Sequence, residues 1–350
     1  MKLLFVADLH LGASYKALSL EKQRARKSEV FNAISSIFEK AKLCGAEAIL
    51  FGGDVFHSNA KNKQTQKYLF NLIEQSDINC FMIFGNHDEK IVLENLPQNL
   101  TVILGQPQSF ELGQDVVLTA FPYNYSDFSC LQSLKSESFN IVMMHGDIFN
   151  SSDKSFINTT LLKNKNIDIL ALGHLHDFMV NKLDERGQVF YSGCTFGNGF
   201  DECGTKGDAL IDTQTSYIEF IPLACRMFHE VDVDISDFES LQNLESMIEK
   251  SFEQFDRDDF VKVNLIGRFN EGQDKFLEVL RRRYSDLFFF FELVDKSRLK
   301  IDLQKIATEK LSFKYEFLRL VNLDESLTDD EKNAISILGV EALSGEEVGI

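Results

Sequence analysis

Five short apolar segments of the 350-residue chain each end in a small group of polar side chains of the kinds that bind metal ions. Six of the seven histidines lie in these groups. Together the groups supply seven candidate metal ligands: Asp8, His10, Asp54, Asn86, His145, His174 and His176. Two carboxylates, one amide and four imidazoles form the ligand set of a hydrolase that uses two divalent metal ions.

Two pairs of these ligands, Asp8 with His10 and His174 with His176, have i,i+2 spacing. In an extended chain this spacing puts both side chains on the same side, so Asp8 and His10 can bind one metal ion together. A glycine precedes the second pair and lets the backbone turn closely. The two histidines of that pair can then supply one imidazole to each metal.

The bridging ligand of a two-metal site has to reach both ions, which lie about 3.5–4 Å apart in such sites. Asp54 follows two glycines in a tight turn, and its carboxylate has two oxygens for this task. Asn86 and His145 would complete the second metal position. Imidazole and carboxylate ligands without a thiolate favour manganese, iron or zinc over calcium.

Three further residues are candidates for catalytic roles. His87 directly follows the ligand Asn86, so it can face the substrate and protonate the leaving oxygen at neutral pH. Asp88 could orient the second ring nitrogen of His87. His57, three residues after Asp54, could support His87 or the phosphate, although a role as a loop hydrogen bonder is a competing interpretation.

The apolar segments are short and continuous, as buried strands of an α/β sheet are, and ligands gather beyond the carboxyl ends of such strands. Helical periodicity predicts helices at 19–43 and 63–75, between the first three strands, which favours a largely parallel sheet. Further strands are predicted at 116–123, 140–145, 168–174, 188–193 and 209–213. The sequence therefore predicts an α/β (α+β) fold with two sheets packed face to face and helices outside.

The pattern changes near residue 222. Predicted helices at 238–255 and 273–284 alternate with strands at 259–267 and 286–294, which indicates a small α/β domain over 226–300 after a first domain over 1–225. Residues 301–350 are predicted to form helices, one at about 307–320 and one opened by the capping box of Thr328 and Glu331.

The composition limits the possible functions. The formal net charge is −18, with −7 in residues 1–225 and −11 in residues 226–350, which argues against a broad basic face for nucleic acid. The run Arg281–Arg283 could contact DNA, but it ends a predicted helix, where solvated cations complement the helix dipole, and we favour this structural interpretation. The six cysteines show no pairing pattern, and no apolar segment approaches the roughly 18 residues of a membrane span. We expect a cytoplasmic protein.

The five motifs resemble those of the calcineurin-like metallophosphoesterase superfamily, and within it those of the SbcD-type and YhaO-type DNA-repair nucleases. The resemblance covers residues 1–225 and is carried by Asp8-Leu-His10-Leu-Gly12, Gly52-Gly53-Asp54-Val-Phe-His57, Gly85-Asn86-His87-Asp88, His145-Gly146 and Gly173-His174-Leu-His176. In the segment after the last motif, Ser192 and Cys194 differ from the residues that the family usually has at these positions.

The resemblance implies a four-layer sandwich with one metal ion held by Asp8, His10, Asp54 and His176. It assigns the other ion to Asp54, Asn86, His145 and His174. His87 would be the catalytic acid, supported by His57. The resemblance also implies manganese, 3′-to-5′ exonuclease and single-strand endonuclease activity on DNA, a homodimer, and a partner ATPase of the SbcC coiled-coil type, bound by the C-terminal helices beyond a capping domain.

Two other classes of function share this ligand set. A phosphodiesterase or phosphatase for nucleotides or proteins would differ only in the walls around the metals. A non-catalytic scaffold could keep the fold, but the complete set of ligands argues against that reading. The additional 125 residues after the first domain favour the nuclease.

Overall fold

The structure is a computed structural model that describes residues 1–57, 63–270, 273–308 and 311–343. It divides into two compact units. Unit 1 comprises Met1–Glu230, Phe255–Val261 and Asp286–Phe291, and unit 2 comprises Val231–Gln254, Lys262–Ser285 and Glu292–Ile350. The three-domain division at 225 and 300 stays a prediction.

Unit 1 contains two six-stranded sheets. The first has the order β12-β11-β1-β2-β3-β4 and consists of β1 (Lys2–Val6), β2 (Ala48–Gly52), β3 (Asn79–Ile83), β4 (Leu100–Val102), β11 (Gly207–Asp212) and β12 (Tyr217–Pro222). Strands β1 to β4 are parallel, and β11 runs antiparallel to β1. The carboxyl ends of β1, β2 and β3 therefore share one edge.

The second sheet has the order β5-β6-β7-β8-β10-β9 and consists of β5 (Gln108–Gly113), β6 (Val116–Ala120), β7 (Phe139–His145), β8 (Ile169–Gly173), β9 (Met179–Lys182) and β10 (Gln188–Tyr191). Its central strands β6, β7, β8 and β10 are parallel. The strands β5 and β9 add antiparallel edges. The ends of β7 and β8 lie together for the same reason as those of the first sheet.

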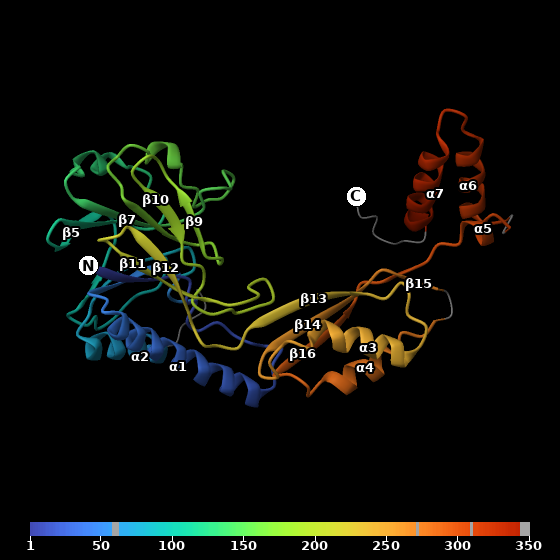
Figure 1. Cartoon of the computed structure of the whole chain (residues 1–350), viewed down its shortest axis with the longest axis horizontal. Helices are drawn as coiled ribbons and strands as arrows, with labels where there is room; N and C mark the ends of the chain where they lie inside the picture. The colour runs from blue at the N-terminus through green and yellow to red at the C-terminus, as the bar shows by residue number, and fades with distance from the viewer. Residues whose placement is uncertain (58–62, 271–272, 309–310, 344–350) are drawn as a thin grey trace. The chain divides into compact units, whose positions relative to one another are not determined.

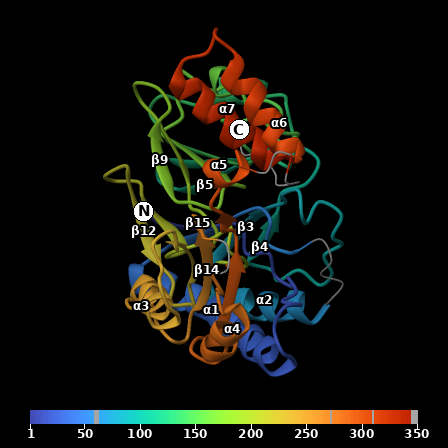
Figure 2. The same cartoon turned by 90° about the vertical axis from the view of Figure 1, so that its right-hand side faces the viewer.

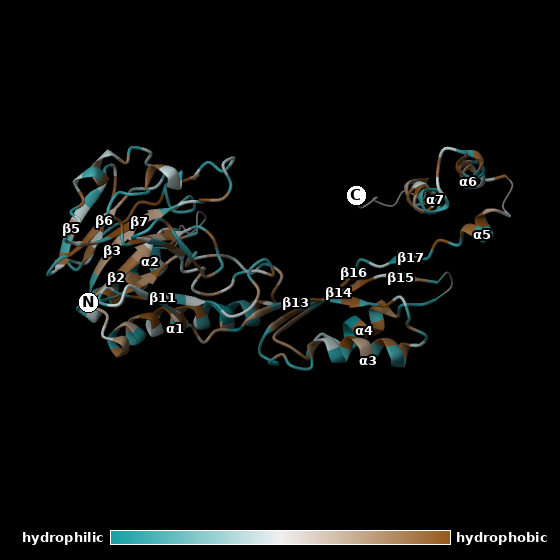
Figure 3. Ribbon diagram, turned by 45° about the horizontal axis from the view of Figure 1, so that its top comes forward, coloured by the Kyte–Doolittle hydropathy of each residue, from teal (hydrophilic) through white to brown (hydrophobic). Residues whose placement is uncertain are grey.

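The two sheets pack face to face around a shared core. Alternate strand residues point into it, among them Phe5 and Leu50 of the first sheet and Ile141 and Phe190 of the second, and all four are fully buried. The rings of Phe5 and Phe190 meet edge to face with centroids 5.2 Å apart. In Figure 3 the strands β2 and β3 are drawn mainly in the brown of hydrophobic residues. The predicted α/β sandwich is confirmed.

The outer face of the first sheet carries α1 (Leu20–Cys44) and α2 (Lys63–Ser76), which lie side by side in Figure 1. Ser19 caps α1 by accepting a hydrogen bond from the Lys22 amide, and Gly45 ends it in the left-handed conformation. Both helices were predicted. The outer face of the second sheet is covered by loops with two 3₁₀ helices, η1 (Ser129–Ser133) and η2 (Thr159–Leu161).

A three-stranded sheet consists of β13 (Phe228–Asp234), β14 (Phe260–Ile266) and β16 (Phe290–Asp295), and most of its residues belong to unit 2. The helices α3 (Leu241–Phe252) and α4 (Leu277–Tyr284) lie on the same side of it, as Figures 1 and 2 show. A short parallel pair joins β15 (Arg268–Phe269) to β17 (Arg298–Leu299). The helices α3 and α4 are both shorter than the sequence predicted.

The described C-terminal residues form α5 (Leu303–Ile306), α6 (Phe313–Leu323) and α7 (Asp329–Leu343). The helix predicted at 307–320 begins only at Phe313, capped by Ser312, and part of its predicted range lies outside the described residues. The capping box before α7 is confirmed, because the Thr328 amide donates to Glu331 Oε2 at 2.8 Å and the Glu331 amide donates to Thr328 Oγ1 at 3.3 Å. None of the described helices has the length and apolar content needed to cross a membrane.

Candidate metal centre

All seven predicted ligands lie in unit 1 at the carboxyl ends of five strands. β1 leads to Asp8 and His10, β2 to Asp54 and β3 to Asn86. β7 ends at His145, and β8 leads to the two remaining histidines of the set. Segments that are far apart in the sequence thus meet at one edge of the sandwich.

The backbone turns sharply at four of these ligands. Asp8, His10, Asp54 and His174 have φ values of 53°, 44°, 50° and 107°, a region that residues other than glycine rarely occupy. The loops after β1 and β2 hold one another, because the Asp8 amide donates to Gly53 O at 3.1 Å and the His10 amide to Asp54 O at 2.9 Å. These loops aim the side chains at a common point.

A first group of ligand atoms joins Asp8, His10 and His176. The Nε2 atoms of the two histidines are 3.4 Å apart, and His176 Nε2 lies 3.9 Å from Asp8 Oδ1. His10 Nε2 also lies 3.9 Å from Asp54 Oδ2. Asp54 therefore stands at the border of this group.

A second group lies on the other side of Asp54. His145 Nε2 is 3.6 Å from Asp54 Oδ2 and 3.2 Å from Asn86 Oδ1. The same Asn86 oxygen is 3.2 Å from His174 Nδ1. The structure therefore brings together all seven ligands predicted from the sequence, with the carboxylate of Asp54 between the two groups.

The arrangement of lone pairs fits divalent cations. His145 Nδ1 lies 2.9 Å from Gly52 O, a carbonyl that can only accept, so the neutral ring keeps its proton there. Its Nε2 then directs a lone pair at the oxygens of Asp54 and Asn86. Asp8 Oδ1 is buried and has no hydrogen-bond partner among the described residues. A divalent cation would satisfy these converging acceptors, because carboxylate, amide and imidazole ligands suit divalent metals.

Burial and mutual charge shift the pKa values of the ligands. Burial raises the pKa of Asp8 to about 7 and lowers that of His10 to about 4. Burial alone would raise the pKa of Asp54, but the hydrogen bond and charge of His145 lower it to about 2. Burial would lower the pKa of His145, and the same contact with Asp54 raises it to about 9. The pair Asp54 and His145 is held together by opposite charge when no metal is bound.

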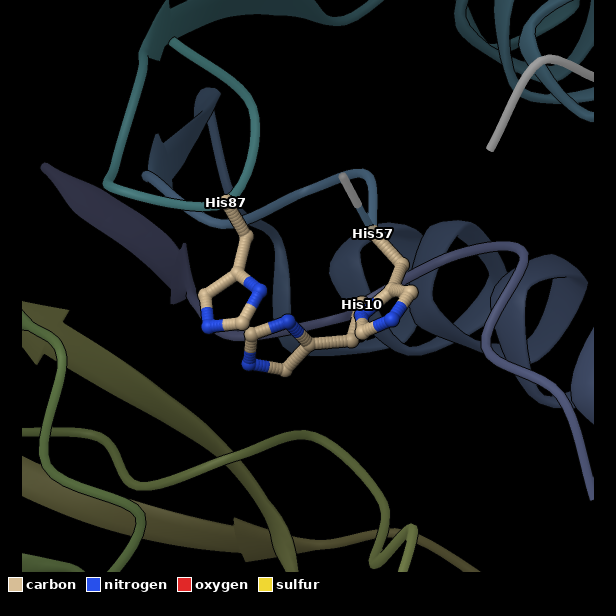
Figure 4. Close-up of side chains that lie close together, drawn as sticks. All are labelled: His10, His57 and His87. Atoms are coloured by element: carbon tan, nitrogen blue, oxygen red, sulfur yellow. The ribbon is translucent and has the colours of Figure 1, made fainter. Parts of the chain in front are cut away.

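The predicted catalytic residues lie beside the first group. Figure 4 shows the rings of His10, His57 and His87 close together. The ring centroid of His87 lies 4.7 Å from that of His10 and 5.4 Å from that of His57, and the rings of His87 and His57 are stacked. The His87 amide donates to Asp54 Oδ1 at 2.8 Å, so the position of His87 is coupled to the bridging carboxylate.

Asp88 is placed differently from the expectation that it orients the His87 ring. Its carboxylate accepts hydrogen bonds from the backbone amides of Gly85 at 2.6 Å and Val55 at 2.8 Å. It is fully buried, and burial raises its pKa to about 7. Asp88 thus ties the loop after β3 to the loop after β2, and its catalytic role stays a prediction.

Glu202 is a site residue that the sequence analysis missed. Its Oε1 lies 2.5 Å from His176 Nδ1, and its Oε2 accepts the Asn198 amide at 2.5 Å. Lys206 Nζ donates to His176 O at 2.9 Å. The carboxylate fixes the ring of His176 from behind, leaving Nε2 to face the ligand group. The only sequence signal was its place in the segment after the last motif.

The cysteines near the site are thiols in packed positions. Cys194 forms a candidate ligand group with His176 and Glu202, but its Sγ lies 3.7 Å from His176 O, within sulfur hydrogen-bond distance. Burial raises the pKa of this thiol well above its ordinary value, which disfavours the thiolate that a metal would bind. Cys203 is half-buried, and burial raises its pKa also.

Comparison with known proteins gives one family. The model of the calcineurin-like phosphoesterases matches residues 1–178. The uncharacterized metallophosphoesterase YhaO of Bacillus subtilis (strain 168) is 25% identical over 272 residues, which are 70% of this chain and 66% of YhaO. The double-strand break repair protein MRE11 of Oryza sativa subsp. indica is 22% identical over 339 residues, covering 71% of this chain and 47% of MRE11. The chain spans less than two thirds of the length of either relative.

Solved structures give more distant likenesses. A dimetal phosphatase from Danio rerio has a TM-score of 0.41 and 8% identity, with 60% of this chain and 91% of that chain covered. The nuclease MPE of Pseudomonas putida has a TM-score of 0.30 and 15% identity, with 62% and 87% covered. The family assignment therefore depends on the sequence match.

Proposed function

The chain belongs to the calcineurin-like phosphoesterase family, and from this premise we propose that it is a manganese-dependent DNA nuclease that hydrolyses phosphodiester bonds in DNA repair. The family supports a divalent-metal phosphoester hydrolase. The similarity to the repair protein MRE11 supports DNA as the substrate. As the finer activities we propose 3′-to-5′ exonuclease and single-strand endonuclease action.

The observation that carries the proposal is the position of Asp54 between two groups of ligand atoms. Its Oδ2 lies 3.9 Å from His10 Nε2 on one side and 3.6 Å from His145 Nε2 on the other. One ion would be held by Asp8, His10, Asp54 and His176, and the other by Asp54, Asn86, His145 and His174. When bound, two such cations polarise the phosphate and acidify a water.

The residues around the ligands supply positioning and proton transfer. His87 is half-buried and lies next to the ligand group, where its ring can give a proton to the leaving oxygen. His57 stacks on that ring and limits its rotation. Asp88 holds the loop that carries His87 through the backbone amides of Gly85 and Val55.

We also propose a homodimer, a partner ATPase of the SbcC coiled-coil type and a cytoplasmic location. The excess of acidic over basic residues supports the need for a partner, because a chain of net charge −18 lacks the cations for extended DNA contact. The exposed apolar residues Phe313, Leu320 and Leu323 on α6 supply a surface that such a partner could cover. The free cysteines suit a reducing compartment.

The test is cleavage of a linear, end-labelled DNA by the full chain with manganese, with and without the chelator EDTA. His87→Ala should lower kcat by about 10²- to 10⁴-fold, the usual contribution of a general acid. Manganese binding, measured by calorimetry, should stay within about twofold because His87 is not among the ligands. His229→Gln, outside the site, should keep wild-type activity.

The other outcomes are equally informative. Rapid hydrolysis of cyclic nucleotides or phosphoproteins without DNA cleavage would replace the nuclease by a phosphodiesterase or phosphatase. A folded chain that binds no manganese would support a scaffold instead. Full DNA cleavage by His87→Ala would refute the role of His87.

A further inference from the structure

A groove in unit 1 leads away from the candidate metal centre. It begins at His10, passes the loop 12–16 and the first half of α1, and reaches Thr65 of α2. Its volume is about 410 Å³. This size is within the range of clefts that bind ligands, about 300–1,000 Å³.

The charge of the groove differs from that of the chain. Lys16, Arg24 and Lys27 line it, and none of its lining residues is acidic. All three side chains are exposed, and none forms an ion pair with any residue that the structure describes. In a chain with 54 acidic and 36 basic residues, the groove is lined by three cations and by no acid. Such a local positive potential attracts anions.

The remaining wall of the groove is mainly apolar and partly aromatic. Phe31 lies edge to face against Tyr68 with centroids 4.5 Å apart, and Phe196 is fully buried at its base. Tyr15 is fixed by a hydrogen bond from its hydroxyl to Asn198 Oδ1 at 2.7 Å. Tyr15 and Phe31 are half-buried, so their rings keep an exposed part beside the cations. Proteins bind single-stranded nucleic acid with cations that meet the phosphates and aromatic rings that meet the bases.

The groove is connected to the reaction site through His10. This residue lines the groove, and its Nε2 belongs to the first ligand group, 3.4 Å from His176 Nε2. A polymer whose scissile phosphate lies at the ligands can therefore continue into the groove.

We propose that the groove formed by the loop 12–16 and α1 binds a single-stranded segment of nucleic acid next to the scissile phosphate, with Lys16, Arg24 and Lys27 contacting its phosphates. This inference rests on the proposed function and adds the surface that selects a polymeric substrate. It also explains how a strongly acidic chain can hold a polyanion at one place.

The test compares three full-length proteins: the wild type, Arg24→Glu/Lys27→Glu, and the control Lys135→Glu/Lys163→Glu. The control makes the same change in net charge at exposed lysines of unit 1 that do not line the groove. Binding of a fluorescein-labelled 20-residue oligothymidylate is measured by anisotropy in EDTA, over a series of salt concentrations. Melting temperatures establish that all three proteins fold.

We expect the groove variant to bind at least tenfold more weakly than the wild type and the control to stay within twofold. Each lost phosphate contact should also reduce the slope of log affinity against log salt by about 0.7. Equal affinity of the groove variant and the wild type would overturn the inference, as would equal weakening in both variants. The inference would also be overturned if polyglutamate displaced the labelled oligothymidylate at a lower concentration than unlabelled oligothymidylate does. That result would indicate that the groove binds an acidic peptide.

Binding without metal separates this inference from the nuclease proposal. If the wild type cleaves DNA with manganese but the groove variant binds normally, the groove fails and the nuclease stands. If the wild type binds through the groove but cleaves no DNA, the nuclease fails and the groove stands.

Discussion

At the scale of single residues, the candidate metal centre is organised by the nitrogens that face away from it. His145 is held through Nδ1 by Gly52 O at 2.9 Å, and His176 through Nδ1 by Glu202 at 2.5 Å. Each contact fixes both the tautomer and the direction of the ring. The Nε2 atoms are thereby presented to the ligand groups before any cation arrives.

Replacing Glu202 should test this organisation directly. Glu202→Gln keeps the size of the side chain and an oxygen that can accept from His176 Nδ1. It removes the negative charge that makes the imidazole a stronger ligand for a metal ion. We expect the affinity of one metal position to fall by about 10- to 100-fold, the usual effect of losing such a partner. Calorimetric titration with manganese measures it, and the second position should change less.

Glu137→Gln is the matched control, because Glu137 is exposed and lies outside the site. Unchanged affinity at both metal positions in Glu202→Gln would mean that Glu202 only stabilises the loop around Asn198. A lower melting temperature with normal titration would lead to the same conclusion.

The sequence predicted the ligands because each follows an apolar strand, and parallel strands bring their carboxyl ends to one edge. It did not reveal Glu202, since that contact depends on the irregular loop between β10 and β11, for which no periodicity exists. It also assigned Asp88 to the His87 ring on adjacency alone. In the structure the backbone amides of two loops, at Gly85 and Val55, take its oxygens instead.

At the scale of elements, the helix α1 is tied to the loop that carries Glu202. Arg26 of α1 is fully buried; one end of its guanidinium pairs with Glu29 at 2.7 Å, and the other donates to Gly197 O at 2.5 Å. The rings of Tyr15 and Phe196 lie within 6.0 Å of it. A buried charge of this kind depends on keeping all its partners.

Arg26→Met should therefore lower the free energy of unfolding by about 3 kcal/mol, since it leaves Gly197 O and part of Glu29 without a partner. Lys42→Met, at an exposed position of the same helix, should change it by no more than about 0.5 kcal/mol. Guanidinium denaturation followed by circular dichroism gives both values. A loss below about 1 kcal/mol in Arg26→Met would show that apolar packing replaces the ion pair there.

Elements with strong local signals were predicted well. α1 has a cap at Ser19 and a stop at Gly45, and the capping box of Thr328 marks α7. The strands β5 and β9 were missed because they are edge strands with largely exposed residues, so the apolar run that marks a buried strand is absent. Edge pairing depends on the neighbouring strand, which a single segment does not reveal.

At the scale of the whole molecule, charge counts hide what the fold creates. Residues 1–225 carry a net charge of −7, and this number gave no sign of a basic groove. The groove arises because the loop 12–16 and α1 bring Lys16, Arg24 and Lys27 together on one surface. An average over many residues cannot report such a local concentration.

The pH dependence of stability is a property of the whole fold, and the buried acid Asp208 should contribute to it. Asp208 of β11 is fully buried, and its Oδ2 has no hydrogen-bond partner among the described residues. Burial raises its pKa to about 7, against the smaller opposing effects of the Thr195 hydroxyl and Lys40. The folded chain therefore holds a proton that the unfolded chain releases near pH 4.

The sign of the effect follows from linkage. Below about pH 4 both states bind the proton, and the contribution of Asp208 to stability is fully present. As pH rises toward 7 only the unfolded state releases the proton, so this contribution is progressively lost, and above pH 7 the loss is complete. Asp208→Asn has no such group, so its advantage over the wild type should grow from pH 4 to pH 7, toward about 4 kcal/mol, and then stay level.

Guanidinium denaturation in EDTA at pH 4.5, 6 and 8 measures this difference without a contribution from bound metal. Asp212→Asn, at the end of the same strand and partly exposed, serves as the control and should follow the wild type at every pH. A difference between Asp208→Asn and the wild type that is the same at all three pH values would show that Asp208 is ionised in the folded chain throughout, with Thr195 and Lys40 sufficient to hold its charge inside the sandwich.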